Sequence, residues 1–236
     1  MGVVRTGPPC ELIDKLRARF EIPVFVETGT YKGDTAAWAA SRFERVLTVE
    51  RSEELHREAT RRLTTFPNVK ALLGDSRVAL QKIIAEADQP AVFWLDAHWC
   101  GGQASAGAND QCPLLDEISI IRESREPKYI LIDDARLFLS PPSPPHRVAD
   151  WPSLSEVLGA LQYDEAARTV VLEDVIVSVP AAAWDIVADY SHAVNLRQWI
   201  EHTTAAAPGV RAGAQMIARD TRLTLAAVRR RLRKLI

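Results

Sequence analysis

Several features are missing from this sequence of 236 residues, and each absence excludes a class of protein. No stretch approaches the roughly 20 consecutive apolar residues of a membrane-spanning helix, and the first residues lack the apolar core of a signal peptide. No internal repeat is present, which excludes solenoids and propellers. The 29 basic and 31 acidic residues leave a net charge of only −2, so we expect no nucleic-acid partner and no general attraction to anionic membranes.

Cysteine is also scarce, with only Cys10, Cys100 and Cys112. An odd number of cysteines does not suit a disulfide framework, and we therefore expect a reducing compartment, the cytoplasm. The remaining composition, 47% hydrophobic and 25% charged, is typical of a globular chain with a substantial core. The length suits one α/β domain with additions.

The chain is organised around a glycine turn. A short apolar run at residues 24–26 predicts a buried strand, which ends in Glu27, Gly29 and Thr30. Gly33 then opens a segment rich in helix formers. A strand, a glycine turn and a helix start together form a site for a nucleotide-like ligand, because glycine permits close approach and the helix start offers free N–H groups.

The spacing of this turn is E-x-G-x-x-x-G, whereas a dinucleotide fold uses G-x-G-x-x-G. An acid at Glu27 repels a pyrophosphate but suits a cationic ligand. The pattern resembles motif I of the class I S-adenosylmethionine (SAM)-dependent methyltransferases. An ordinary strand-to-helix turn is the alternative interpretation.

Two further strand ends carry candidate cofactor ligands. A predicted strand at residues 45–50 ends in Glu50, about twenty residues after the first glycine, where an acid accepts hydrogen bonds from ribose hydroxyls. The strand at residues 69–73 ends near Asp75 and Ser76. Asp75 has two compatible roles, binding the adenine amino group and capping the next helix.

Acids also follow the fourth and fifth strands, which are predicted at residues 91–96 and 129–134. Asp96 ends one strand, and Asp133 and Asp134 end the other. In an open α/β sheet these ends share one crevice, where unpartnered carboxylates would repel one another. A hard divalent cation such as Mg²⁺ would relieve that repulsion, so all three acids are candidate metal ligands.

This arrangement resembles the metal-dependent small-molecule O-methyltransferases, including the macrocin type that methylates natural-product sugars. The resemblance implies a metal that binds the acceptor hydroxyl and lowers its pKa. The sequence departs from that family at His98, where the family tends to have a second acid. His98 is therefore a candidate metal ligand or general base, with Asp96 as the other candidate base. Zinc bound by His98, Cys100 and Cys112 is a weaker alternative because the spacing is irregular.

Arg136 and the segment 100–111 lie beside the predicted site, and each has more than one possible role. Arg136 either holds an anionic acceptor or neutralises the neighbouring acids. The glycine-rich segment 100–111 is long for a loop and follows the fourth strand, which favours a lid over the site.

The order of predicted elements is a strand and a helix repeated four to five times, then a helix at 154–161 and a hairpin at 169–179. This order predicts an open, doubly wound, mostly parallel sheet with helices on both faces. The resemblance to class I methyltransferases extends over residues 20–180 and implies a Rossmann-like sheet of seven strands with an antiparallel final strand. We expect a SAM-binding domain at 1–180 and a helical extension at 181–236.

Within the extension, residues 216–236 carry leucines among arginines, as in an amphipathic helix. A helix that covers the domain or forms a homodimer is favoured over a membrane-surface or partner helix.

These observations predict a SAM-dependent O-methyltransferase acting on a small hydroxylated acceptor, a sugar or a glycosylated metabolite. Glu27, Gly29, Glu50 and Asp75 would hold SAM, and Asp96 or His98 would take the hydroxyl proton. A metal-dependent hydrolase or oxygenase on a related scaffold is one alternative. A non-catalytic SAM-binding module is the other, since fold does not fix function.

Overall fold

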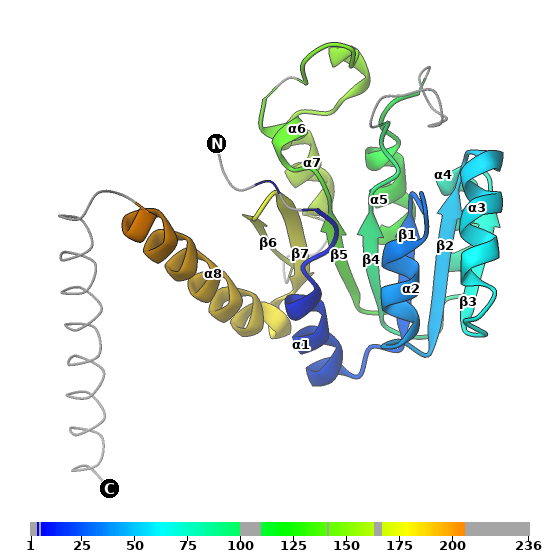
Figure 1. Ribbon diagram of the computed structural model, residues 1–236, viewed down its shortest axis with the longest axis horizontal. Coiled ribbons are helices and arrows are strands. Elements are labelled where there is room, and N and C mark those ends of the chain that lie inside the picture. Colours follow the sequence, from blue (N-terminus) through cyan, green and yellow to red (C-terminus); the bar gives the residue numbers. More distant parts are fainter. Residues whose placement is uncertain (1–3, 5, 100–109, 141, 163–166, 206–236) are drawn as a thin grey trace, which may run out of the picture. The chain divides into compact units, whose positions relative to one another are not determined.

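A computed structural model describes residues 4, 6–99, 110–140, 142–162 and 167–205 (Figure 1). The chain divides into two compact units, residues 1–186 and 187–236. The first unit contains the whole sheet and every candidate site residue. The second contains most of helix α8 (Trp184–Ala205).

The first unit is built on a seven-stranded sheet with the order β3-β2-β1-β4-β5-β7-β6. Strands β1 to β5 are parallel, whereas β7 runs antiparallel to both β5 and β6. The strands are β1 (Val24–Thr28), β2 (Arg45–Glu50), β3 (Val69–Leu73), β4 (Ala91–Leu95), β5 (Lys128–Ile132), β6 (Ala167–Leu172) and β7 (Val175–Pro180). The predicted mostly parallel sheet with an antiparallel final strand is confirmed.

Helices cover both faces of this sheet (Figure 1). In that view α1 (Cys10–Phe20), α2 (Asp34–Ala40) and α3 (Glu53–Leu63) lie in front of the sheet, whereas α4 (Ser76–Ala85), α5 (Leu114–Arg122) and α7 (Leu154–Leu161) lie behind it. The short α6 (Arg136–Leu139) follows β5, and two 3-10 turns lie at Val148–Asp150 and Ala181–Ala183.

Alternation along the strands sends side chains to the two layers of helices. Phe25 of β1 contacts the rings of Trp38 and Phe43 on the α2 side. Its neighbours Val24 and Val26 join the cluster formed with α4, α5 and α7. Because both faces are covered, every residue of β1, β4 and β5 is buried, which explains why β4 is apolar throughout and why β1 and β5 are apolar over most of their length.

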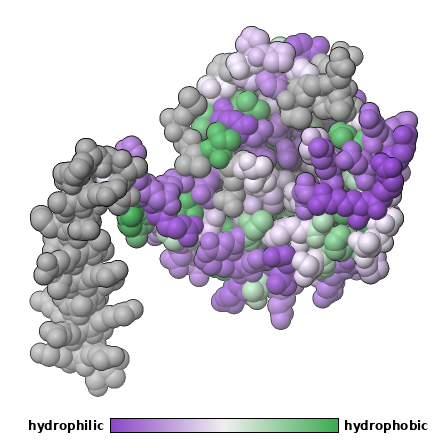
Figure 2. All heavy atoms as spheres, viewed as in Figure 1, coloured by the Kyte–Doolittle hydropathy of each residue, from purple (hydrophilic) through white to green (hydrophobic). Residues whose placement is uncertain are grey.

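The sequence of helix α3 explains both its amphipathic packing and the residue at which it begins. Leu55, Ala59 and Leu63 lie at helical spacing and are buried, while the outward face is charged and appears hydrophilic in Figure 2. Ser52 caps the helix by accepting a hydrogen bond from the N–H of Leu55, and the first turn is acidic. These features place the end of β2 firmly beside the start of α3.

Most element boundaries agree with those expected from the sequence, with small differences at helix ends. Helix α2 ends at Ala40, where the sequence predicts a helix to about residue 43, and α5 ends at Arg122, where it predicts one to about residue 125. The turn between β6 and β7 places Glu173 and Asp174 at positive φ, as a tight hairpin turn requires. Helix α6 was not expected, because its single turn is too short to show a periodic pattern.

Two predictions fall outside the described residues, namely most of the lid at 100–111 and the amphipathic helix at 216–236. The ends of the lid segment are nevertheless described, and the N–H of Trp99 donates to the carbonyl of Gln111 at 2.7 Å. A search of the described helices found none with the length and apolarity needed to cross a membrane.

Candidate active site

The glycine turn after β1 brings three strand ends together. Gly29 has φ +87°, and a Cβ on it would lie 2.2 Å from the carbonyl oxygen of Asp96 at the end of β4. The N–H groups of Gly29 and Thr30 donate to the carbonyl of Val49 in β2 at 2.9 and 3.1 Å. Only glycine combines this backbone angle with this close approach, so the predicted role of Gly29 rests on a definite steric requirement.

Glu50 ends β2 beside this turn and is held by backbone amides. Its two carboxylate oxygens accept the N–H groups of Tyr31 and Ser52, each at 2.8 Å. The residue is only 8% exposed. Each oxygen keeps a further lone pair, so the clamped carboxylate can still accept the two hydroxyls of a ribose.

Glu27 is buried at the end of β1 among hydroxyl groups. Thr48 donates to Glu27 Oε2 at 2.6 Å, and the hydroxyls of Thr30 and Thr48 are also 2.6 Å apart. Burial, with smaller contributions from the charges of Asp96 and Glu50, raises the pKa of Glu27 to about 8. Among the described residues no basic side chain forms an ion pair with Glu27, which makes this end of the site receptive to a cation.

The acid that follows β3 has partners of a different kind from those of Glu27 and Glu50 at the ends of β1 and β2. Asp75 caps α4, as one of its two predicted roles required, and accepts the N–H of Arg77 at 2.9 Å. The guanidinium of Arg77 also contacts both oxygens of Asp75, at 2.9 and 2.7 Å, and holds the pKa of that carboxyl below its usual range. Arg77 further binds Asp110 and Asp116. Asp75 is therefore less available to a ligand than its sequence position indicates, while Ser76 is buried beside it.

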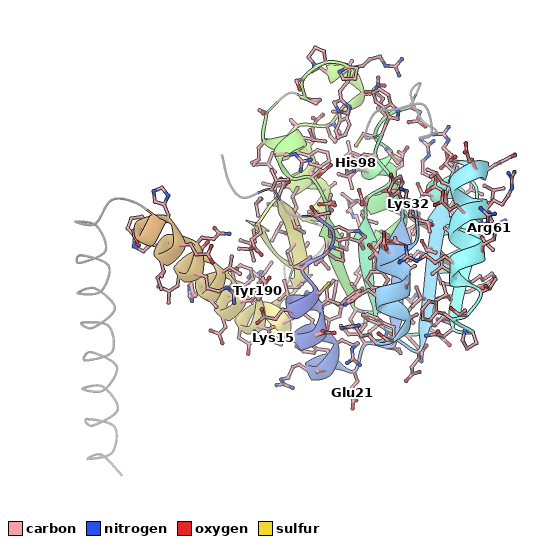
Figure 3. The ribbon with its side chains drawn as sticks, in the orientation of Figure 1. Lys15, Glu21, Lys32, Arg61, His98 and Tyr190 are labelled. Carbon is pink, nitrogen blue, oxygen red and sulfur yellow. The ribbon has the colours of Figure 1, made fainter. Side chains whose placement is uncertain are left out.

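His98 and Asp96 follow β4 at the carboxyl ends of the strands, where His98 is labelled in Figure 3. His98 Nε2 lies 2.8 Å from Asp134 Oδ2 and 3.8 Å from Asp96 Oδ1. The ring also packs edge-on against Trp151 and Phe138. Burial acts to lower the pKa of His98, but the bond to Asp134 and the neighbouring acids raise it above its usual value.

Asp96 is the more accessible partner of the two, with 36% of its side chain exposed. Burial of the remainder is the main cause that raises the pKa of Asp96 to about 7, and the charges of Asp133 and Asp134 add to it. A carboxylate with that pKa can accept a proton near neutral pH.

The predicted Asp133–Asp134 pair is present after β5, but its two members differ. Asp133 is 6% exposed, and burial raises its pKa to about 6. The contacts of Asp134 with His98 and Arg136 outweigh burial and lower its pKa. Arg136 also binds the buried Asp174 through both its side chain and its backbone N–H. Two roles were predicted for Arg136, holding an anionic acceptor or neutralising acids. Its contacts with Asp134 and Asp174 are those expected of the second role.

These contacts bear on the predicted metal site. Across the described ranges, no group of three or more His, Cys, Asp or Glu side chains is arranged to hold a metal ion. The side chains of His98 and Arg136 already bind Asp134, so the donor set does not fit a divalent ion as it stands. Cys100, one of the alternative zinc ligands, lies outside the described residues. Metal binding therefore stays a prediction.

One buried acid at the site was missed from the sequence. Glu117 in the first turn of α5 is 1% exposed, and burial raises its pKa to about 7. The charge of Glu117 helps to raise the pKa of Asp96, and His98 in turn acts to lower the pKa of Glu117. The signal was available, because Glu117 falls on the apolar stripe of its helix, one residue before Ile118 and three after Leu114.

The structure therefore brings the predicted residues to one edge of the sheet. Glu27, Gly29, Thr30 and Glu50 meet at the ends of β1 and β2, and Gly33 has φ +79° at the N-cap of α2. Asp96, His98, Asp133 and Asp134 meet at the ends of β4 and β5. A glycine cradle and a clamped carboxylate fit a nucleoside, and an acid without a basic partner fits a sulfonium.

Comparison with known proteins gives matches in structure only. No protein-family model matches the sequence, and neither does any curated protein. Among solved structures, the O-methyltransferase TomG from Streptomyces achromogenes, in complex with SAM, is 13% identical with a TM-score of 0.52 over 75% of this chain and 82% of its own. An O-methyltransferase from Bacillus cereus, in complex with S-adenosylhomocysteine (SAH), is 16% identical with a TM-score of 0.54 over 74% of this chain and 82% of its own.

A protein from Streptococcus mutans, also in complex with SAH, is 13% identical with a TM-score of 0.52 and is matched over 99% of its length by 75% of this chain. At these identities the likeness concerns the fold. Together with the strand order and the glycine turn, it shows that this chain has the fold of the class I SAM-dependent methyltransferases.

Proposed function

We propose that this protein is a SAM-dependent O-methyltransferase that acts on a hydroxyl group of a small molecule. The observation that carries the proposal is the clamp on Glu50, whose two oxygens are fixed by the N–H groups of Tyr31 and Ser52 beside the Gly29 turn. A carboxylate fixed in this way at the end of β2 suits a ribose diol. Two of the similar structures are O-methyltransferases, one solved with SAM and one with SAH.

The cofactor supplies the methyl group on a sulfonium. Around it, Gly29 would permit close approach of the backbone, Glu50 would accept the ribose hydroxyls, and Glu27 would face the positive charge. Binding a cation stabilises the ionised form of Glu27, which burial otherwise disfavours.

Asp96 is the better placed general base of the two candidates. It is the more exposed, and its pKa of about 7 suits proton transfer near neutral pH. His98 is nearly enclosed, is bonded to Asp134, and has a raised pKa, so it is better suited to orienting and stabilising the acids than to accepting a proton. No step in this scheme depends on a metal ion.

The acceptor, the compartment and the assembly are proposed from other features of the chain and of its structural neighbours. TomG is involved in tomaymycin synthesis, which supports a small-molecule acceptor. A sugar or glycosylated acceptor rests on the resemblance of the strand-end acids to the macrocin type. We further propose a cytoplasmic location, a SAM-binding domain at 1–180 and a homodimer formed through the extension at 181–236.

Calorimetric titration with SAH tests the cofactor site directly. We expect the wild-type protein to bind SAH, and Glu50→Ala to bind it about 100-fold more weakly, because two hydrogen bonds to a charged group are lost. Glu53→Ala is the matched control, since Glu53 is an exposed glutamate three residues further along the chain. Its affinity should stay within about twofold of wild type. Failure of the wild-type protein to bind SAH would refute the proposed function.

Transfer of a labelled methyl group to a panel of sugars and glycosylated compounds tests the chemistry. With an acceptor in hand, Asp96→Asn should lower the rate by about 100-fold or more while SAH affinity changes little. An unchanged rate in this variant would exclude Asp96 as the base.

A further inference from the structure

A groove of about 400 Å³ lies between helix α4 and the face of the sheet that this helix covers. Its floor is formed by apolar side chains from four strands, namely Val26, Leu47, Leu72 and Phe93. Of the described candidate site residues, only Asp75 lines the groove, at the point where β3 leads into α4. The groove is therefore a separate feature from the proposed cofactor site at the ends of β1 and β2.

The groove exists because α4 leaves part of the sheet uncovered. Helix α4 packs mainly against α5, whereas on the opposite face α3 packs directly on β3. As a result Leu47 and Ile83 are only partly buried, and two further side chains of the lining, Leu73 and Val78, are 51% and 54% exposed. Apolar surface gathered in one hollow and left in contact with water favours an apolar occupant.

The charged residues that line the groove favour an anion. Lys70 of β3 and Lys82 of α4 both line it, and among the described residues neither lysine forms an ion pair. Arg45 adds a third basic side chain. Of the two acids in the lining, Asp75 is already held by an arginine, which leaves Glu86 as the acid that offsets this charge.

The two lysines lie at the same level of the groove. Helix α4 runs back along β3, because it connects two parallel strands of one sheet. Lys70 is three residues, or about 10 Å, before the end of β3. Lys82 is six residues, or about 9 Å, after the start of α4. The strand and the helix therefore present a basic side chain from each wall to the same part of the groove.

We propose that this groove binds a small organic acid with an apolar body, whose carboxylate lies between Lys70 and Lys82 and whose apolar part covers Leu47 and Leu72. The volume is within the range of small-molecule sites, about 300–1,000 Å³. The C-terminal segment 206–236 of the chain itself is strongly basic in sequence, so it does not suit a groove with an excess of basic residues. The inference goes beyond the proposed function and does not depend on it.

The test uses anilinonaphthalene sulfonate (ANS), which joins an apolar ring system to a negative charge and fluoresces in apolar surroundings. The full chain is titrated with ANS, both without and with SAH. We expect saturable binding of one ANS per chain with a Kd of about 10–100 µM. Decanoate, an apolar chain that ends in a carboxylate, should displace the probe, whereas SAH should not.

Two variants locate the probe. Lys70→Gln/Lys82→Gln should weaken ANS binding by about tenfold or more. It should leave the affinity for phenylnaphthylamine, the same ring system without the sulfonate, within about twofold. Ala79→Trp, which fills the groove from α4, should weaken the binding of both probes by about tenfold or more. Lys15→Gln/Arg19→Gln, which removes two exposed basic residues of α1 on the opposite layer, is the matched control and should bind both probes as wild type does.

The inference is overturned if ANS does not saturate, if decanoate fails to displace it, or if SAH displaces it. It is also overturned if the control variant weakens ANS binding as much as Lys70→Gln/Lys82→Gln does. Flotation of the protein with phosphatidylserine vesicles, lost in the lysine variant, would assign this surface to a membrane instead. Because both lysines are exposed, the lysine variant should fold and keeps the inference testable even if Ala79→Trp does not.

Discussion

The two halves of the site hold their acids in opposite ways. At the ends of β1 and β2, Glu27 and Glu50 accept hydrogen bonds from neutral groups, the hydroxyl of Thr48 and the N–H groups of Tyr31 and Ser52. At the end of β5, Asp134 is bound by the His98 ring and by the guanidinium of Arg136.

This difference separates their functions. Neutral donors do not cancel the charge of a carboxylate, so Glu27, which holds a proton near neutral pH because burial raises its pKa to about 8, can ionise when a cation such as a sulfonium binds beside it. The guanidinium of Arg136 offsets the charge of Asp134, and the His98 ring occupies its other oxygen, so this acid already has protein partners. A metal ion would have to displace these two side chains to bind Asp134, and neither contact is visible in the sequence.

The largest effect is expected for Gly29→Ala. The added methyl group would disrupt the turn at the ends of β1 and β2 and leave the contacts of Asp134 intact. The added methyl would lie 2.2 Å from the carbonyl of Asp96 at a φ of +87°. We expect SAH binding to be lost and unfolding free energy to fall by about 3 kcal/mol or more, measured by calorimetry and by chemical denaturation.

The matched control for that variant is Gly159→Ala in α7, where a Cβ would meet no atom within 4 Å. This variant should be more stable than wild type by up to about 1 kcal/mol, because alanine is the better helix former. Equal effects of the two substitutions would show that the Gly29 turn is not sterically required.

Glu27→Gln tests the first half of the site through the pH dependence of stability, because it removes a buried acid that has no basic partner among the described residues. The pKa of Glu27 is about 8 in the folded state and near 4.5 when unfolded. Between these values the folded state holds a proton that the unfolded state has lost, so wild-type stability should fall as pH rises from about 4.5 to 8. Glu27→Gln should lack this loss.

Denaturation of both proteins at a series of pH values measures the effect. The variant should match wild type near pH 4 and exceed its stability by about 2–4 kcal/mol above pH 8. A stability difference between the two proteins that does not change with pH would mean that Glu27 is ionised in the folded protein. Added SAM should reduce the difference, since a cation favours the ionised form of Glu27.

Arg136→Met gives the smallest expected effect and acts on the second half alone. It removes the guanidinium from Asp134 and from the buried Asp174, although the N–H of residue 136 still holds Asp174. Because Arg136 is 39% exposed, we expect a loss of only about 1–2 kcal/mol, with SAH affinity unchanged. Arg62→Met, which removes an exposed pair with Asp34, should cost under about 0.5 kcal/mol. A large loss of SAH affinity in Arg136→Met would contradict the separation of the two halves.

Much of this architecture follows from local patterns in the sequence. Continuous apolar runs mark the buried strands, helical spacing marks the amphipathic helices, and the acids and glycines at strand ends mark the ligand edge. These features are predictable because each depends on residues a few positions apart. Helix α6 was missed for the same reason, since one turn contains too little pattern.

Tertiary structure alone decided which charges meet. Arg136 and Asp174 are 38 residues apart, His98 and Asp134 are 36 apart, and no local period links either pair. Asp75 is held by Arg77, which also contacts Asp110 and Asp116 from beyond β4, whereas Glu50 is held by the backbone N–H groups of Tyr31 and Ser52. The sequence by itself determined where acids would gather. Only the fold, by burying some and pairing others across long separations, decided which of them remain available to a ligand.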